Sequence, residues 1–309
     1  MNRRRVLGPV LGVAMALAST LVVSACGLSG DGVQVGSTNF SESQILANLF
    51  AESMEYSGIP SQVKELTTTE VVEPALERNQ LQVMPGYLAT FTEYLNAKKN
   101  GPSAPPVSSN NVAATLAAGQ PLANAVGLTI LNPAAAQDQN AFAVTPAYAA
   151  ANNLKTLSQL GVFSQTNNVI LGAGPDCPTR PFCEPGLEST YGIKFSNFVS
   201  LDTGGPLTVQ ALLQGSINLG LVFSSSGFIS AYDLQVLADD KHLQAADNVI
   251  PVVNTSAMTP TMAAALNAVT AQLTTEDLQN MNAQVDLERK DPVDVARAWL
   301  ASHGITPAS

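Results

Sequence analysis

Residues 33–44 have the sequence VQVGSTNFSESQ and join a predicted strand, 33–37, to a helix predicted to begin near Ser41. Ser41 and the next three residues resemble a capping box, and Gly58 supplies a stop signal. Between them, apolar residues recur at helical spacing, as expected for a helix with one buried face: Ile45, Leu46, Leu49, Phe50 and Met54. Open α/β sheets bind ligands where a strand ends and a helix starts, so the loop 38–40 is a candidate binding loop.

The same alternation of strand and helix continues along the chain. Strands are predicted at 81–84, 141–144, 168–171, 219–223, 234–237 and 249–253. Helices are predicted at 70–80, 88–99 and 206–214, after Thr145-Pro146, and over 261–303 with breaks near 274–275 and 291–292. This order indicates an α/β architecture with mostly parallel sheets.

The N-terminus has the features of a secretory signal peptide over residues 1–25. Three arginines at 3–5 precede an uncharged run at 6–23, and small residues lead to Cys26. We expect cleavage before Cys26, a lipid on its thiol and a short tether over 26–32, which anchors the chain outside the cytoplasm. The alternative is an ordinary transmembrane helix, since the run is about long enough to span a bilayer.

Charge and cysteine content limit the function further. The formal net charge is −10, and it becomes more negative once the three leader arginines are removed, which argues against nucleic-acid binding. Cys177 and Cys183 are close together in a chain predicted to be exported, which favours a disulfide. A zinc site is the alternative, but the two histidines, His242 and His303, are far away in sequence.

Sequence motifs of catalysis are mostly absent. The chain has no Gly-x-Ser-x-Gly elbow and no Walker A loop, and Gly172-Ala173-Gly174 lacks the third glycine of a dinucleotide loop. Scattered carboxylates leave a paired acid/base site open. We expect a protein without catalytic activity, cofactor or metal.

Several segments together resemble the osmoprotectant-binding proteins of ABC importers, of the glycine betaine, choline and carnitine type. Residues 35–42 are similar to the opening motif of that family, and 85–90 to its Pro-Glu-Tyr-Thr-Gly-Thr segment. Later matches occur in the expected order at 186–192, 226–234, 236–241, 251–253, 273–278 and 282–286.

The resemblance implies a type II periplasmic-binding-protein fold, in which two α/β lobes joined by two hinge crossings close on a ligand. By analogy, residues 33–137 and 247–309 form one lobe and 138–246 the other, with crossings near Asp138 and Ala246. It also implies a monomer that delivers a small solute to permease and ATPase subunits.

The resemblance also supplies candidate ligand-binding residues. The family surrounds a quaternary ammonium with four tyrosines and holds the ligand carboxylate with a Lys/Arg pair. Here only Tyr87 matches the tyrosines, and other residue types stand at the remaining positions. The full candidate set is Thr38, Asn39, Phe40, Tyr87, Thr90, Asp138, Asn140, Arg180, Phe223 and Asp247.

The departures from the family's pattern predict a changed ligand preference. Asn140 and Asp247 replace two aromatic faces, which removes roughly 0.5–2 kcal/mol of cation–π attraction each. We therefore expect glycine betaine to bind weakly or not at all, and a polar or hydroxylated solute to use Thr38, Arg180 and the two replacements. A sensor or scaffold on the same fold and a cell-surface enzyme are the alternative functions.

Overall fold

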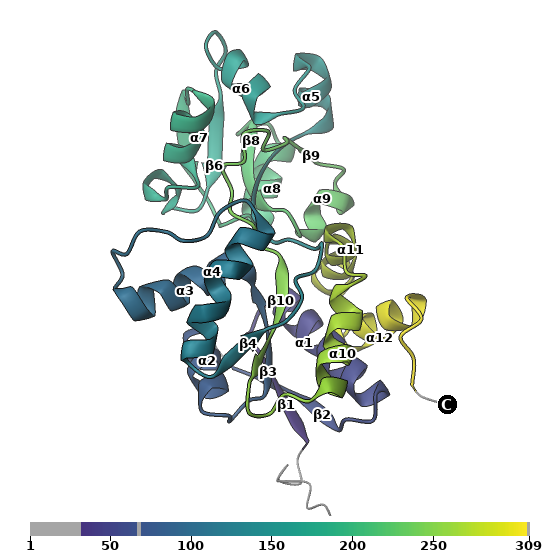
Figure 1. Ribbon diagram of the computed structural model, residues 1–309. Helices are drawn as coiled ribbons and strands as arrows, with labels where there is room; N and C mark the ends of the chain where they lie inside the picture. The colour runs from purple at the N-terminus through teal and green to yellow at the C-terminus, as the bar shows by residue number, and fades with distance from the viewer. Residues whose placement is uncertain (1–31, 67–68, 308–309) are drawn as a thin grey trace, which may run out of the picture.

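The protein is described by a computed structural model over residues 32–66 and 69–307, which contains two five-stranded sheets in separate units (Figure 1). The unit drawn at the bottom of Figure 1 is called the lower unit, and the one at the top the upper unit. The predicted signal peptide and Cys26 lie outside the described residues.

The lower sheet has the strand order β2-β1-β3-β10-β4. Its strands are β1 (Val33–Ser37), β2 (Ser61–Glu65), β3 (Val83–Tyr87), β4 (Leu128–Ile130) and β10 (Val249–Asn254). Strand β10 is buried along its whole length because helices cover both faces of the sheet. Val249 and Val253 pack into one core, and Ile250 and Val252 into the other, as the two-residue period of a strand requires.

Seven helices cover the lower sheet within the described residues. One core contains α1 (Ser41–Tyr56), α10 (Pro260–Thr270), α11 (Thr275–Asp286) and α12 (Pro292–Ser302). The opposite core contains α2 (Thr69–Glu77), α3 (Leu88–Asn100) and α4 (Val112–Ala125).

The upper sheet has the order β7-β6-β8-β5-β9. Its strands are β5 (Asn140–Val144), β6 (Ile170–Ala173), β7 (Asn197–Ser200), β8 (Leu219–Phe223) and β9 (Gln235–Val236). Helices α5 (Pro146–Asn152), α6 (Leu157–Phe163) and α7 (Glu184–Tyr191) share one core, and α8 (Pro206–Leu213) and α9 (Gly227–Ala231) the other.

Both sheets are mixed, so the expectation of mostly parallel sheets is wrong. Strand β10 runs antiparallel to β3 and β4, and β5 runs antiparallel to β8 and β9. Each of these strands is the first one after the chain passes from one sheet to the other. It enters its sheet from the side facing the other unit, so it runs in the direction opposite to the strands on either side of it.

The local predictions had mixed outcomes. Strand 33–37 is confirmed, as are the Pro146 helix start and the breaks that divide 261–303 into three helices. The capping box is wrong: Phe40 is the N-cap residue of α1 and makes no side-chain cap, while Ser41 Oγ donates to Asp286 Oδ1 at 2.5 Å. A helix over 112–125 was not predicted.

Candidate functional site

The two sheets present the carboxyl ends of their parallel strands to each other. In the lower unit β3 ends at Tyr87, which pairs with Val249 at the start of β10. In the upper unit β8 ends at Phe223, which pairs with Asn140 at the start of β5. Both chain passages between the sheets run through this region, where Gln137 and Asn248 form an antiparallel bridge. This is the edge at which open α/β sheets bind ligands.

The first hollow at this edge has a volume of about 450 Å³ and is called the Asp247 hollow. The lower unit contributes polar side chains and one tyrosine, and the upper unit contributes amides and two phenylalanine rings. Its lining comprises Tyr87, Ala89, Thr90, Glu93, Ser108, Asp138, Gln139, Asn140, Phe182, Phe223, Gln244, Ala245 and Asp247.

A second hollow of about 490 Å³, called the Asn282 hollow, shares Asp138 and Phe223 with the first. It also takes residues from both units. Its lining comprises Phe40, Ser41, Glu42, Asp138, Gly204, Gly205, Phe223, Ser225, Ser226, Phe228, Asn282 and Asp286.

A smaller side pocket of about 150 Å³ lies within the lower unit. It is lined mainly by apolar side chains, among them Val72, Met84 and Phe91. It shares Tyr87 and Thr90 with the Asp247 hollow and Phe40 with the Asn282 hollow, so the three spaces are neighbours.

A buried hydrogen-bond chain links the two units beside the Asn282 hollow. Glu42, in the first turn of α1, accepts the Tyr87 hydroxyl on Oε1 at 2.5 Å and Asn282 Nδ2 on Oε2 at 2.6 Å. The same Asn282 amide donates to the Ser225 carbonyl of the upper unit at 2.9 Å. Burial raises the pKa of Glu42, and the nearby Asp286 raises it further.

Asp247 is held by the start of α3. Its carboxylate accepts the Thr90 backbone N–H at 2.9 Å and the Thr90 hydroxyl at 2.6 Å, which satisfies a free N–H at that helix end. Burial nevertheless raises the pKa of Asp247.

Asp138 lies between the two hollows and lines both. It accepts one hydrogen bond, from Ser225 Oγ at 2.9 Å. Burial raises its pKa well above the ordinary value, and the charges of Glu42 and Asp247 add to the rise. Three mutually repelling carboxylates therefore surround the centre of the cleft.

The structure places most of the predicted site residues together. Those lining the Asp247 hollow are Tyr87, Thr90, Asp138, Asn140, Phe223 and Asp247. Thr38 and Phe40 line the side pocket, and Phe40 also lines the Asn282 hollow. Asn39 is exposed and lines none of the three.

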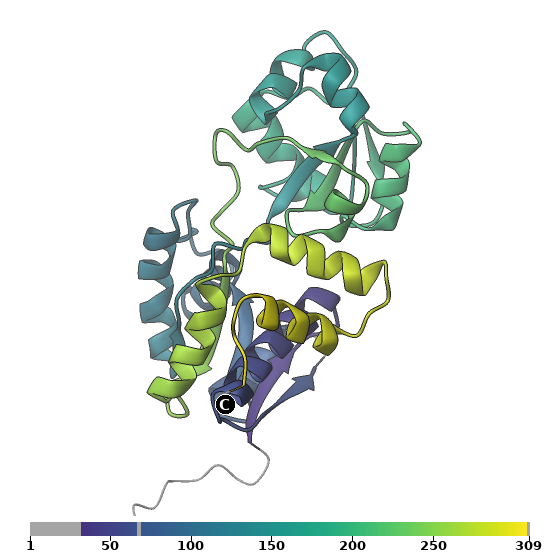
Figure 2. The same cartoon turned by 90° about the vertical axis from the view of Figure 1, so that its right-hand side faces the viewer.

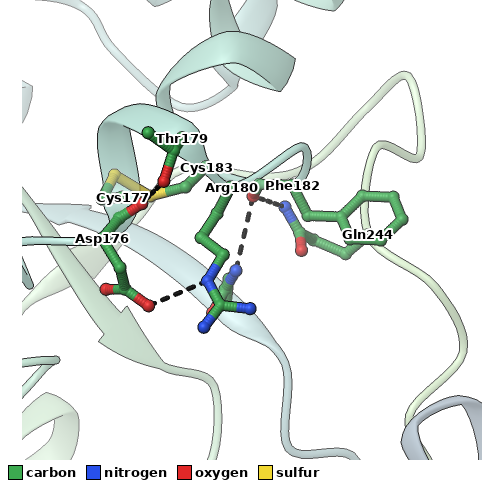
Figure 3. Close-up of a disulfide and its surroundings, with 8 residues drawn as sticks. Asp176, Cys177, Thr179, Arg180, Phe182, Cys183 and Gln244 are labelled. Atoms are coloured by element: carbon green, nitrogen blue, oxygen red, sulfur yellow. Dashed lines mark hydrogen bonds and ion pairs between the residues drawn. A yellow bond between two sulfur atoms is a disulfide. The ribbon is translucent and has the colours of Figure 1, made fainter. Parts of the chain in front are cut away.

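Arg180 is not brought into the hollows. It lies in the loop closed by the Cys177–Cys183 disulfide, which the structure forms as predicted (Figure 3). Its Nε donates to Asp176 Oδ2 at 2.9 Å, and both side chains are at least half exposed. The neighbouring Phe182 is the residue of this loop that reaches the Asp247 hollow, where its carbonyl accepts Gln244 Nε2 at 2.9 Å.

Sequence reasoning missed several cleft residues, notably Glu42, Phe182, Asn282 and Asp286. Glu42 was assigned to a capping box, although its position directly after the candidate loop was a usable signal. Asn282 lies 240 residues from its partner Glu42, and no local pattern connects the two.

Among residues 32–66 and 69–307 no group of three or more His, Cys, Asp or Glu is arranged to hold a metal ion. None of the helices there is long and apolar enough to cross a bilayer.

Two α/β units with mixed sheets, joined by two chain passages around a shared cleft, define the class of two-lobe periplasmic binding proteins. Residues 31–302 match the family described as the substrate binding domain of ABC-type glycine betaine transport system. The chain belongs to this family. It is the extracytoplasmic substrate-binding component of an ABC importer and not an enzyme.

Known proteins similar to the chain agree with this assignment. The glycine betaine-binding protein YehZ of Escherichia coli is 29% identical over 89% of this chain and 91% of its own length. The carnitine transport binding protein OpuCC of Listeria monocytogenes is 24% identical over 93% of each chain. The solved structure of apo YehZ has a TM-score of 0.76, covering 89% of this chain and 99% of that one at 28% identity.

Proposed function

We propose that the chain captures a small polar solute in the cleft between the two units and delivers it to the permease and ATPase subunits of an importer. The observation that carries this proposal is that the Asp247 and Asn282 hollows are each lined by both units. A solute in either hollow contacts both units at once and therefore stabilises the relative position of the units in which it binds best. A permease can recognise that position of the two units.

The test begins with the solute that the protein retains. Mass spectrometry of small molecules released from the purified protein identifies it, and uptake of that solute in labelled form is compared in cells with and without the gene. We expect uptake to fall when the gene is deleted. Unchanged uptake contradicts the delivery role and favours a sensor or scaffold.

We propose a solute of the osmoprotectant type, with glycine betaine bound weakly or not at all. Support for the type comes from the relatives, which are named for glycine betaine and carnitine binding. Support for weak betaine binding comes from Asn140 and Asp247, which offer no aromatic face to a quaternary ammonium. Calorimetry that gives a low-micromolar or tighter Kd for glycine betaine refutes this part of the proposal.

We also propose that the protein acts as a monomer, binds no nucleic acid and is anchored through a lipid on Cys26, with residues 26–32 as a tether. Cys26 follows the small residues of a lipoprotein cleavage site. A Cys26→Ala variant is expected to leave the membrane fraction and appear in the medium or periplasm. Retention of that variant in washed membranes argues for a transmembrane anchor instead.

A further inference from the structure

The charged side chains described at the two hollows are all acidic. Glu93, Asp138 and Asp247 line the Asp247 hollow, and Glu42, Asp138 and Asp286 line the Asn282 hollow. Among the described residues, no lysine, arginine or histidine lines either hollow. Arg180, the expected cation, is paired with Asp176 in the disulfide loop (Figure 3). A ligand carboxylate in either hollow would therefore meet carboxylates and no compensating cation.

Two carboxylates that line the hollows have unused hydrogen-bond acceptor capacity. Asp138 uses one oxygen to accept Ser225 Oγ, and within residues 32–66 and 69–307 no donor is bonded to its Oδ2. Asp286 likewise accepts Ser41 Oγ on Oδ1, and its Oδ2 has no donor in the same residues. A carboxylate binds a ligand N–H in a short charge-assisted hydrogen bond, which a fully methylated nitrogen cannot form.

An amide supplies a further, independent acceptor. Asn282 lines the Asn282 hollow, is 5% exposed, and donates its Nδ2 to two acceptors, Glu42 Oε2 and the Ser225 carbonyl. Both partners are acceptors, so the nitrogen of the amide must face them and the oxygen Oδ1 must point the other way. That Oδ1 has no hydrogen-bond partner in the described structure. The atom is itself buried, so a ligand donor satisfies it only if the Asn282 side chain shifts toward the hollow, and a ligand that brings only acceptors never does.

We propose that the cleft selects a protonated primary or secondary amine, a cation with N–H donors and no carboxylate, over zwitterions and over fully methylated ammonium ions. The ammonium sits beside Asp138, where the two hollows meet, and the Phe223 ring shared by both contributes cation–π attraction. This inference rests on the proposed function, because it assumes that the solute binds in the cleft.

The test is calorimetry with two matched ligand pairs, each an amine and its fully N-methylated counterpart. Ethanolamine is compared with choline, and 1,4-diaminobutane with its bis(trimethylammonium) analogue, with glycine betaine as the zwitterion. We expect the amine to bind at least about tenfold more tightly than its methylated partner in one pair or both, as the loss of a charge-assisted hydrogen bond implies. Equal affinities, a preference for the methylated ligands in both pairs, or no binding by either amine overturns the proposal.

Two variants test whether Asp138 is responsible for the preference for amines. Asp138→Asn removes the charge with little change of shape and is expected to lower the amine affinity at least about tenfold while leaving a folded protein. Asp294→Asn removes an equal charge from the exposed first turn of α12 and is expected to leave the affinity unchanged. Equal affinity in Asp138→Asn and the parent protein counts against the proposal. The proposed function is tested by a different measurement: it is refuted if uptake of the retained solute is the same with and without the gene.

Discussion

At the scale of single residues, the cleft is organised by buried and half-buried carboxylates, and no basic side chain of the described residues lines the two hollows beside them. Burying the Glu42 carboxylate costs free energy. The Tyr87 hydroxyl and the Asn282 amide offset part of this cost, because each donates a short hydrogen bond to the carboxylate. Tyr87 is therefore an electrostatic partner of Glu42 as well as an aromatic face of the cleft. Its second role was not predicted, since the family pattern describes only the ring.

Replacing Tyr87 with Phe tests that role. The change leaves Glu42 Oε1 without its donor in a buried position, and we expect a loss of about 1–2 kcal/mol in the free energy of unfolding at neutral pH. Tyr56→Phe is the matched control, because Tyr56 packs on the lower core and no hydrogen bond of its hydroxyl is described. Urea denaturation measures both, and a Tyr87→Phe protein as stable as the parent would contradict the assigned partnership.

Asp138→Asn has a second expected effect, on stability as a function of pH. Burial and the neighbouring carboxylates raise the pKa of Asp138 well above its ordinary value of 3.8. A raised pKa in the folded protein means that folding favours the neutral form of Asp138. The stability that Asp138 contributes in this way is complete below pH 3.8 and is lost as the pH rises through the pKa of the folded protein. The Asn variant does not ionise and avoids this loss.

We therefore expect Asp138→Asn to melt at a higher temperature than the parent at neutral pH, with the difference shrinking as the pH falls toward 4. Thermal melts at several pH values between about 4 and about 8 measure the difference. Asp294→Asn again serves as the control. If Asp138→Asn instead melts below the parent at neutral pH, and that deficit disappears on acidification, the folded pKa of Asp138 is lowered rather than raised.

At the scale of secondary-structure elements, α4 shows why some helices escape prediction. Its sequence is rich in alanine and includes Gly119 and Pro121, so it lacks the apolar periodicity that identifies an amphipathic helix. It packs on α3 through a close approach at Gly119. A Cβ there would lie 2.3 Å from Thr92 Oγ1 and 3.3 Å from Ile130 Cδ1.

Gly119→Ala is expected to destabilise the protein by about 1–2 kcal/mol, because overpacking outweighs the gain of about 1 kcal/mol in helix propensity. Adding Thr92→Ala should relieve the clash, giving a favourable coupling of about 1 kcal/mol in a double-mutant cycle. Thr92→Val is the control partner, since its Cγ fills the place of Oγ1 and gives no relief. Additive effects in the Thr92→Ala cycle would exclude this contact as the cause.

At the scale of the whole molecule, the units are held together on one side by α9 and α11, and Figure 2 shows α11 lying across the base of the upper unit. Two amides of α11 donate to upper-unit carbonyls, Gln279 to Ser224 at 2.7 Å and Asn282 to Ser225 at 2.9 Å. Gly227 permits the approach: a Cβ there would lie 2.4 Å from the Ala283 nitrogen. Because backbone atoms cannot move aside as a side chain can, a Cβ at this position requires one of the two helices to shift.

Gly227→Ala is expected to push α9 away from α11 and so separate the units on this side. Small-angle scattering should show a larger radius of gyration, and the affinity for the retained solute should fall. Ser230→Ala, on the exposed face of α9, is the control and should change neither. An unchanged radius of gyration in Gly227→Ala would mean that the contact does not set the spacing of the units.

The sequence predicted most of what is local and much less of what is distant. Strand 33–37 was located, as were the breaks between the three C-terminal helices, which are marked by residues with strong positional preferences such as Thr274 and Pro292. Six of the candidate site residues line the Asp247 hollow, because the resemblance to the family identified positions at or near the ends of strands. The pairing of Glu42 with Asn282 depends on how separate segments meet, which neither periodicity nor motif order records. Arg180 was missed for a different reason, because its partner Asp176 lies only four residues away in the same loop and holds it there.

The bridge between Gln137 and Asn248 has a consequence for how the polypeptide can be cut and rejoined. The upper sheet comes from one unbroken stretch, β5 to β9, whereas the lower sheet is assembled from two pieces on either side of it. Strands β4 and β10 are antiparallel and their extensions already meet at this bridge. A short turn in place of residues 138–247 would close them into an ordinary hairpin. The lower unit could then be produced by excision, and the same point would accept a fluorescent protein as an inserted guest.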